Sequence, residues 1–150
     1  MEKEYITILR GGLIATTVMT IMMLLAPMMG MPKMDIGKML AGFLHLPVTM
    51  GWVMHFVIGI VLSGFHILKF KSILPGNNII RGMLFSLIPF FMAQLVVMPM
   101  MGAGVFSSNT PAPGMMVMGS LFGHLVYGAV LGMSTSSIKK EIPKKVLENV

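Results

Sequence analysis

Long stretches without a charged residue constrain this chain more than any other feature. Asp, Glu, Lys and Arg are all absent from 11–32, 46–68 and 82–138. A soluble domain carries about 25% charged residues because its surface faces water, whereas this chain carries 11%. Burial in lipid accounts for such uncharged stretches, so the sequence predicts an integral membrane protein.

Four segments are long enough to cross a bilayer, which takes about 20 apolar residues in a helix. Backbone polar groups cannot stay unpaired in lipid, so these segments are expected to be helices. The sequence therefore predicts an all-α fold, a bundle of four transmembrane helices in one membrane domain covering 1–150. The predicted spans are roughly 7–29, 48–69, 79–101 and 115–135.

The basic residues predict how the spans are oriented. Cytoplasmic flanks of membrane proteins are enriched in Lys and Arg. With the N-terminus inside, nine basic residues fall on the cytoplasmic side and only Lys33 and Lys38 on the outer side. We therefore expect both termini in the cytoplasm, with a basic tail at 136–150. The nine are Lys3, Arg10, Lys69, Lys71, Arg81, Lys139, Lys140, Lys144 and Lys145.

A short amphipathic helix is expected in the first outer loop, at about 35–44. Asp35 is suited to cap its start. The apolar residues that follow have the i, i+3, i+4, i+7, i+8 spacing of one helical face. They are Ile36, Met39, Leu40, Phe43 and Leu44. About ten residues cannot span a bilayer, so this helix should lie on the outer surface.

The two halves of the chain share sequence features. Arg10-Gly11 opens the first span and Arg81-Gly82 the third, 71 residues later. The second and fourth spans share a His-x-Val-x-Gly-x-Val-Leu run, beginning at His55 and at His124. We infer a tandem duplication of a helical hairpin, with repeat 1 at about 7–69 and repeat 2 at about 79–135. Such parallel repeats are related by an axis along the membrane normal.

This symmetry would place His55 and His124 at matching depth, about 10–14 Å from the outer surface. Small residues follow each histidine at i+4 and i+8, a pattern that lets membrane helices approach closely. We expect these small residues to form helix contacts and both histidines to face the bundle interior. The small residues are Gly59, Ser63, Gly128 and Gly132.

Three interpretations of the histidine pair stay open, because an ionisable group inside a membrane suggests function. Each imidazole can simply hydrogen-bond within the bundle and lock it. Two imidazoles from facing helices can instead ligate the iron of a b-type haem, or provide half of a metal site. The other two histidines differ: His66, beside Lys69 and Lys71, is expected at the cytoplasmic interface, and His45 in solvent.

Methionine is unusually frequent, with 20 residues in 150. Many lie in the outer half, where thioethers are soft ligands suited to Cu(I). An outer-facing copper-handling protein is therefore one hypothesis, while the alternative is that methionine fills irregular helix contacts. The candidate ligands are Met28, Met54, Met100 and Met116.

No pattern points to catalysis. The chain has no cysteine and no carboxylate within a predicted span, and no nucleophile–base pair, phosphate-binding glycine loop or HExxH motif appears. We therefore expect a non-enzymatic protein, an accessory or binding subunit. Its basic residues flank apolar segments, which favours lipid headgroups over nucleic acid. Besides the bilayer, the expected partner is a second copy or a larger membrane complex.

Three motifs resemble a known family. They are Gly51-Trp52-x-x-His55-Phe56, Met98-Pro99-Met100-Met101-Gly102-Ala103-Gly104-x-Phe106 and Gly123-His124-Leu125-Val126-Tyr127-Gly128. Together they resemble an uncharacterised family of small bacterial four-span membrane proteins, known as a domain of unknown function. The resemblance implies the fold, the topology and a bacterial inner membrane, but no activity.

Overall fold

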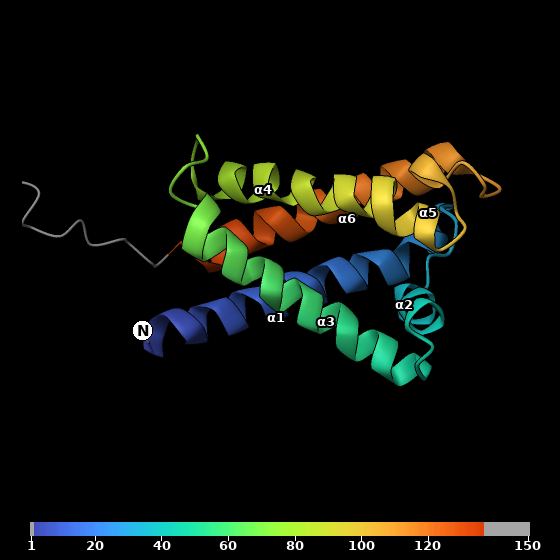
Figure 1. Cartoon of the computed structure of the whole chain (residues 1–150). Coiled ribbons are helices and arrows are strands. Elements are labelled where there is room, and N and C mark those ends of the chain that lie inside the picture. Colours follow the sequence, from blue (N-terminus) through green and yellow to red (C-terminus); the bar gives the residue numbers. More distant parts are fainter. Residues whose placement is uncertain (1, 137–150) are drawn as a thin grey trace, which may run out of the picture.

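The computed structural model describes residues 2–136, and these form helices and connecting loops (Figure 1). The predicted tail at 136–150 lies outside the described residues except for Ser136. The long helices are α1 (Glu2–Leu25), α3 (Val48–Phe65), α4 (Asn78–Met92) and α6 (Pro113–Ser134). The shorter elements are η1 (Ala26–Met29), α2 (Ile36–Leu44), η2 (His66–Phe70), η3 (Ala93–Val97), α5 (Met98–Met100) and η4 (Val105–Ser107).

Four continuous helical segments are long and apolar enough to cross a membrane, which confirms the prediction of four spans. Two segments include a π-helical turn, η2 at the end of the second and η3 inside the third. The first begins five residues before its predicted start, with its charged first turn included. The segments are Glu2–Met29, Val48–Phe70, Asn78–Met100 and Pro113–Ser134.

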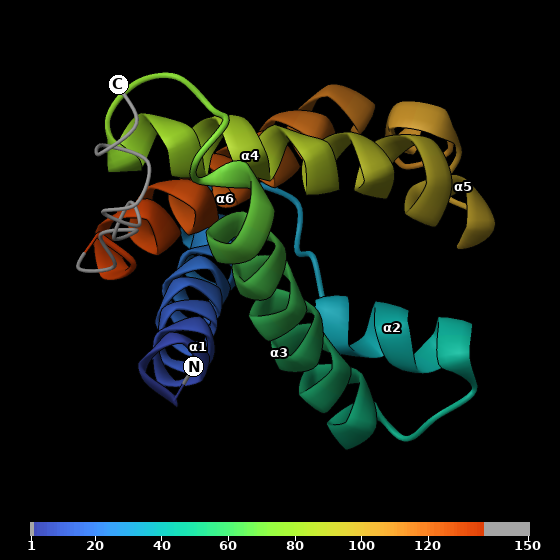
Figure 2. The ribbon, with the colours of Figure 1, turned by 60° about the vertical axis from the view of Figure 1, so that its left-hand side comes forward.

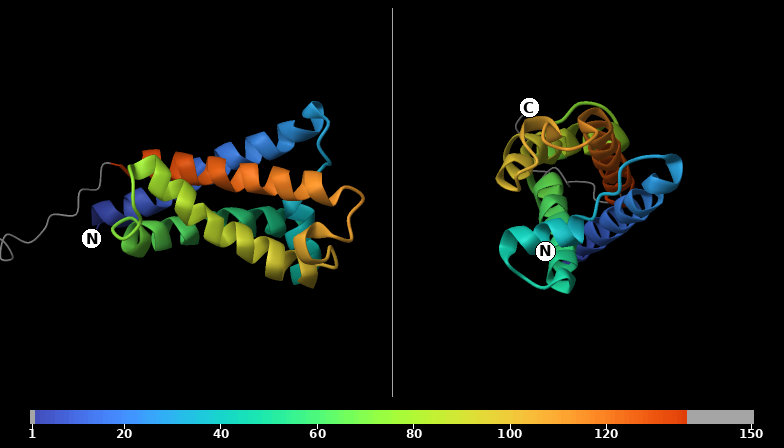
Figure 3. Two further views of the ribbon diagram at one scale, coloured as in Figure 1. Left: turned by 90° about the horizontal axis from the view of Figure 1, so that it is seen from above. Right: turned by 90° about the vertical axis from the view of Figure 1, so that its right-hand side faces the viewer.

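The bundle has two distinct ends (Figures 1 and 3). One, called here the basic end, comprises the start of α1, η2, the start of α4 and the end of α6. The other, called the α2 end, comprises η1, α2, the start of α3, α5, η4 and the start of α6. Lys3, Lys69, Lys71 and Arg81 belong to the basic end, and Lys33 and Lys38 to the α2 end.

The helices neighbour one another in the order α3, α1, α6, α4. α1 packs against both α3 and α6, and α6 packs against both α1 and α4. α4 reaches the first hairpin through η2, at the basic end. A small core joins α1, α4 and α6 where Ala15, Phe85, Tyr127 and Leu131 meet. Most other large apolar side chains are exposed, as expected for helices that face lipid.

Glycines bring the backbones of α4 and α6 into contact. A methyl group on Gly82 would overlap the carbonyl oxygen of Gly128, and one on Gly132 would overlap the carbonyl oxygen of Asn78. A methyl group on Gly128 would lie 2.6 Å from Ser86 Oγ. Close approach of this kind maximises van der Waals contact where no hydrophobic force acts between helices.

α1 and α3 meet in the same manner. A Cβ on Gly12 would lie 2.6 Å from the Cα of Ile60, and one on Gly59 would overlap Thr16 Oγ1. Ser63 lies one turn further along α3, opposite Gly11. The predicted small residues thus lie at contacts inside each hairpin, whereas the long contact between hairpins is made by α1 and α6.

α2 forms where the sequence predicted it. The Asp35 side chain accepts a hydrogen bond from the backbone N–H of Lys38 at 3.0 Å and caps the helix. α2 crosses the start of α3 (Figure 2), where Gly51 meets the carbonyl oxygen of Gly37 and Gly37 meets the Trp52 ring. The face of α2 that packs on the bundle therefore carries Gly37, Leu40 and Ala41, whereas Phe43 and Leu44 of the predicted apolar face are exposed.

Gly82→Ala is expected to destabilise the protein by about 1–3 kcal/mol, the usual effect of overpacking a close contact. The added methyl group must push α4 away from the Gly128 carbonyl. Thermal or SDS-induced unfolding in mild detergent measures the change. Gly42→Ala is the matched control because Gly42, on α2, has open space around it. Equal stability of the two variants would contradict this account of the α4–α6 contact.

Candidate functional site

His55 lies on α3, where a hydroxyl of α1 fixes its ring. The Thr20 hydroxyl donates to the Thr16 carbonyl at 2.7 Å, so its oxygen can only accept from His55 Nε2, 3.1 Å away. The His55 proton is therefore on Nε2, and Nδ1 keeps its lone pair. Trp52 and Phe56 flank the ring edge-on, with centroids at 6.0 and 5.7 Å.

His124 lies on α6 and is fixed by its own helix. Its Nδ1 donates to the carbonyl oxygen of Ser120 at 2.7 Å, which leaves the lone pair on Nε2. The ring packs edge-on against Phe90 of α4, with centroids 5.8 Å apart. Each of the two histidines thus uses one ring nitrogen in the bundle and keeps the other as a potential ligand.

A hydrogen bond joins the helices that carry the two histidines. The Tyr127 hydroxyl donates to the carbonyl oxygen of Gly59 at 2.6 Å. Gly59 lies four residues after His55 and Tyr127 three residues after His124, so both histidines are about one turn from this bond.

This bond bears on the haem hypothesis. A bis-histidine haem needs its porphyrin ring between the two helices, and Tyr127 already bridges α6 and α3 one turn below the histidines. The Tyr127 side chain is buried where this bond joins the two helices. The close tie between α6 and α3 disfavours a porphyrin beside it.

The four predicted methionine ligands do not share one location. Met28 is 84% exposed and Met100 61% exposed, and their elements, η1 and α5, lie at different corners of the α2 end (Figure 3). Met54 and Met116 are half-buried on α3 and α6. Their role in copper binding stays a prediction. Within residues 2–136, no group of three or more His, Asp or Glu side chains could hold a metal ion.

Two other methionines pack against glycines of α6. The methyl group of Met19 is 3.4 Å from a Cβ built on Gly123, and that of Met31 is 2.7 Å from one built on Gly119. Glycines four residues apart on α6 thus make room for two methionine side chains, on the part of the helix that precedes His124. The sequence carried this signal, Gly119-x-x-x-Gly123 before a histidine, but it was not used to choose among the methionines.

His66, predicted at the cytoplasmic interface, lies at the basic end and is buried. It begins the π-helical turn η2 and is 0% exposed, with its ring 5.2 Å from that of Phe85. Within the described residues neither ring nitrogen has a hydrogen-bond partner. The sequence did not predict this burial, which arises because the face of α3 that holds Gly59 and Ser63 continues through His66 into the bundle. His45, as expected, is exposed.

The third span also contains a buried polar residue, Gln94. It lies in the π-helical turn η3, is 0% exposed, and accepts a hydrogen bond from Ser107 at 3.2 Å. Pro89, four residues before η3 begins, has no N–H to continue the helical ladder, so the irregular turn follows a break in the ladder of α4. The bond fixes η4 against the third span.

The profile of one family matches nearly the whole chain, over residues 2–146, and that family is described as a family of unknown function, DUF6789. The chain belongs to this family. No curated protein and no solved structure matches it. The motifs around His55, Met98 and His124 had pointed to such a family, so the predicted resemblance is confirmed at that level.

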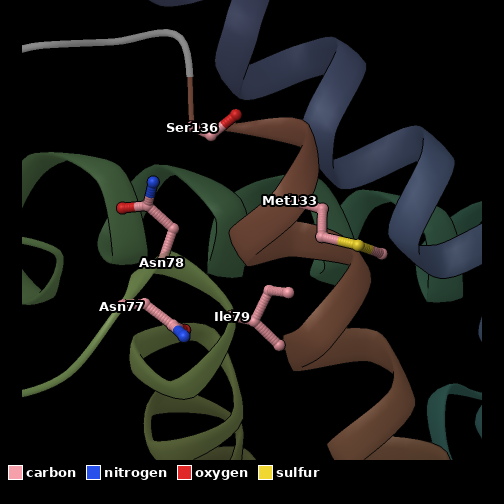
Figure 4. Close-up of a pocket in the computed structure, with 5 residues that line it drawn as sticks. All are labelled: Asn77, Asn78, Ile79, Met133 and Ser136. Atoms are coloured by element: carbon pink, nitrogen blue, oxygen red, sulfur yellow. The ribbon is translucent and has the colours of Figure 1, made fainter.

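This DUF6789 protein also has a shallow hollow of about 360 Å³ at its basic end (Figure 4). The start of α4 meets the end of α6 there. The lining side chains combine amides and a hydroxyl with two apolar groups: Asn77, Asn78, Ile79, Met133 and Ser136. The hollow lies at the other end of the bundle from His55 and His124.

Tyr127→Phe is expected to lower stability by about 0.6 kcal/mol, the average for a side-chain hydrogen bond between membrane helices. The variant removes only the hydroxyl that joins α6 to α3. Unfolding by SDS, followed by circular dichroism, measures the change. Tyr5→Phe is the control because Tyr5 is exposed. If both variants behave alike, the bond to Gly59 does not hold these helices together.

Proposed function

We propose that this protein is a non-enzymatic, multi-pass protein of the bacterial cytoplasmic membrane that binds a small ligand between His55 and His124. The observation that best supports this proposal is the hydrogen bonding of the two imidazole rings. Hydrogen bonds to Thr20 and Ser120 leave one nitrogen lone pair free on each imidazole. Two fixed imidazoles with free lone pairs are half of a metal site.

Cu(I) is the metal that the surroundings favour. Met19 and Met31 pack on α6 at the two glycines that precede His124, and thioethers are ligands that Cu(I) prefers. The other polar groups near the pair are hydroxyls and carbonyls, which a soft metal ion binds weakly. The proposed protein is therefore a binding or accessory subunit that handles copper within the membrane.

The distribution of basic residues supports a cytoplasmic location for both termini. Lys3, Lys69, Lys71 and Arg81 share the basic end, whereas Lys33 and Lys38 are at the α2 end. Placing the basic end in the cytoplasm satisfies the positive-inside rule. The α2 helix and the histidine pair then belong to the outer half of the membrane.

We also propose that the fold arose by duplication of a hairpin. Gly12, Gly59 and Thr16 form a contact in the first pair of spans, and Gly82, Gly128 and Ser86 form its counterpart in the second. The halves have since diverged, because α1 contacts α6 along its length whereas α4 meets the first hairpin through η2. The exposed apolar faces suit lipid, a second copy of the chain or a larger complex.

The ligand is tested on protein purified in mild detergent, by metal analysis before and after loading with Cu(I) and by an absorbance spectrum. We expect about one copper per chain, with His55→Ala and His124→Ala each lowering its affinity at least tenfold, an ordinary effect of losing a metal ligand or its support. His45→Asn is the control, since His45 has a positive φ of 55° that asparagine tolerates.

Two results would contradict the copper proposal. A reduced spectrum with the α-band of a b-type cytochrome, lost in both histidine variants, would show haem instead. If the protein binds neither, and both histidine variants only unfold at lower temperature, the pair is structural.

The orientation is tested by cysteine labelling, since the chain has no cysteine of its own. Lys38→Cys, at the α2 end, is expected to react with a membrane-impermeant maleimide in spheroplasts. Ser72→Cys, exposed at the basic end, should react only after the membrane is permeabilised. The reverse pattern would place the termini outside.

A further inference from the structure

Three side chains of the first hairpin contain buried polar atoms without a partner. These atoms are the hydroxyl oxygens of Thr16 on α1 and Ser63 on α3 and both ring nitrogens of His66, and none makes a hydrogen bond within residues 2–136. Thr16 is 1% exposed, and Ser63 and His66 are 0% exposed. Polar groups buried this deeply in native proteins are almost always hydrogen-bonded, to protein or to ordered water.

Hydroxyls elsewhere in these helices are satisfied by their own backbone. Four of them donate to a carbonyl oxygen three or four residues earlier, and they belong to Thr7, Thr20, Ser86 and Thr135. This bond is the ordinary one for a hydroxyl inside a helix. Thr16 and Ser63 do not make it, so their hydroxyls are turned away from their own helices.

Both hydroxyls are directed at the interface between α1 and α3, which lie side by side (Figure 2). A methyl group on Gly59 of α3 would overlap Thr16 Oγ1. One on Gly11 of α1 would lie 3.3 Å from Ser63 Oγ and 2.9 Å from the methyl group of Thr135. Since Thr135 follows α6, the hydroxyl of Ser63 is enclosed where α1, α3 and the end of α6 meet.

The ordinary acceptor for Ser63 is already engaged. Four residues earlier on α3 is Gly59, and its carbonyl oxygen accepts the hydrogen bond from Tyr127 at 2.6 Å. The contact between the two hairpins thus takes the acceptor that Ser63 would use. Thr16 lies opposite Gly59, about one turn, or roughly 6 Å, from Ser63 along α3.

His66 extends the same face toward the basic end. Its backbone N–H donates to the carbonyl oxygens of Leu62 and Ser63, so the chain is helical between Ser63 and His66. Residues three apart on a helix have Cβ atoms about 5–6 Å from each other, a separation that one water molecule can bridge. Phe85 of α4 covers the imidazole, with ring centroids 5.2 Å apart.

We propose that Thr16, Ser63 and His66 bind internal water along the face of α3 that meets α1. Each hydroxyl can donate and accept a hydrogen bond, and a neutral imidazole has one nitrogen of each kind. Water matches this mixture of donors and acceptors. A buried water molecule makes about three hydrogen bonds, typically to groups that are otherwise unpaired.

A cation suits these residues less well than water. Among residues 2–136 the carboxylates are those of Glu2, Glu4 and Asp35, and all three precede α3 in the chain and lie outside the central part of α1. A cation between Thr16 and Ser63 would therefore have only neutral ligands. The hydrated site is also independent of any ligand at His55 and His124.

Water-edited solid-state NMR of the protein in lipid, with isotope-labelled histidine, tests the proposal directly. The chain has four histidines, and the loss of a signal in a single variant assigns it. We expect magnetisation from water to reach the His66 ring at short mixing times, as it reaches the exposed His45. In Ser63→Ala the early transfer to His66 should be lost while that to His45 is unchanged.

The direction of the stability change is a second readout. Ser63→Ala is expected to lower the unfolding temperature in mild detergent by about 2–4 °C, the shift for one net hydrogen bond in a chain of this length. If no water is bound, the same variant removes an unpaired hydroxyl and raises that temperature. Ser86→Ala is the matched control, because Ser86 lies at the equivalent contact of the second hairpin and donates to the Met83 carbonyl.

Three outcomes would overturn the proposal. The first is that magnetisation from water does not reach the His66 ring of the wild-type protein. The second is that Ser63→Ala raises the unfolding temperature relative to Ser86→Ala. The third is that sodium chloride stabilises the protein and choline chloride does not, which would assign the site to a cation. If Ser63→Ala does not fold, the NMR measurement on the wild-type protein decides.

Discussion

Close contact of glycines with the neighbouring backbone holds together the two helices of each hairpin of this protein. Lipid tails are as apolar as leucine, so burial of apolar side chains gives membrane helices little reason to associate. What remains is van der Waals contact at short range, which requires that no Cβ stands between the helices. Gly82 against Gly128 and Gly12 against Gly59 meet this condition. The positions of the side chains on all four helices follow from these two close approaches.

Polar side chains occupy the space that the glycines leave. Thr16 lies against Gly59, Ser86 against Gly128 and Ser63 against Gly11. The Tyr127 hydroxyl then reaches the Gly59 carbonyl and joins the two hairpins. The histidine pair depends on this construction, because His55 is held by a hydroxyl of α1 and His124 by the backbone of its own helix. The candidate site is thus built on the same contacts that stabilise the fold.

Local sequence patterns predicted the helices well, but they did not predict which helices pack against each other. Hydropathy identified four spans, and Asp35 with its apolar spacing identified α2, because both depend on residues close in sequence. Which helices touch depends instead on faces far apart in sequence, so the small-residue pattern predicted helix contacts without saying that they join the two helices of each hairpin. The lysine neighbours of His66 indicated only that it lies near the cytoplasmic interface, and they did not predict its burial on the helical face that it shares with Ser63.

The π-helical turn η2 has a consequence for the register of the whole second span. A π turn contains one residue more than an α turn would hold, and each residue of an α-helix turns the chain by about 100°. Because the π turn takes up this extra residue within one turn, a regular α-helix of the same residues would instead rotate Lys71 relative to Gly59 by about that angle. The face that meets α1 and the lysine that reaches α6 could then no longer be satisfied together. The extra residue therefore allows one helical segment to make both contacts at once, the packing of Gly59 on α1 and the hydrogen bond from Lys71 to the end of α6.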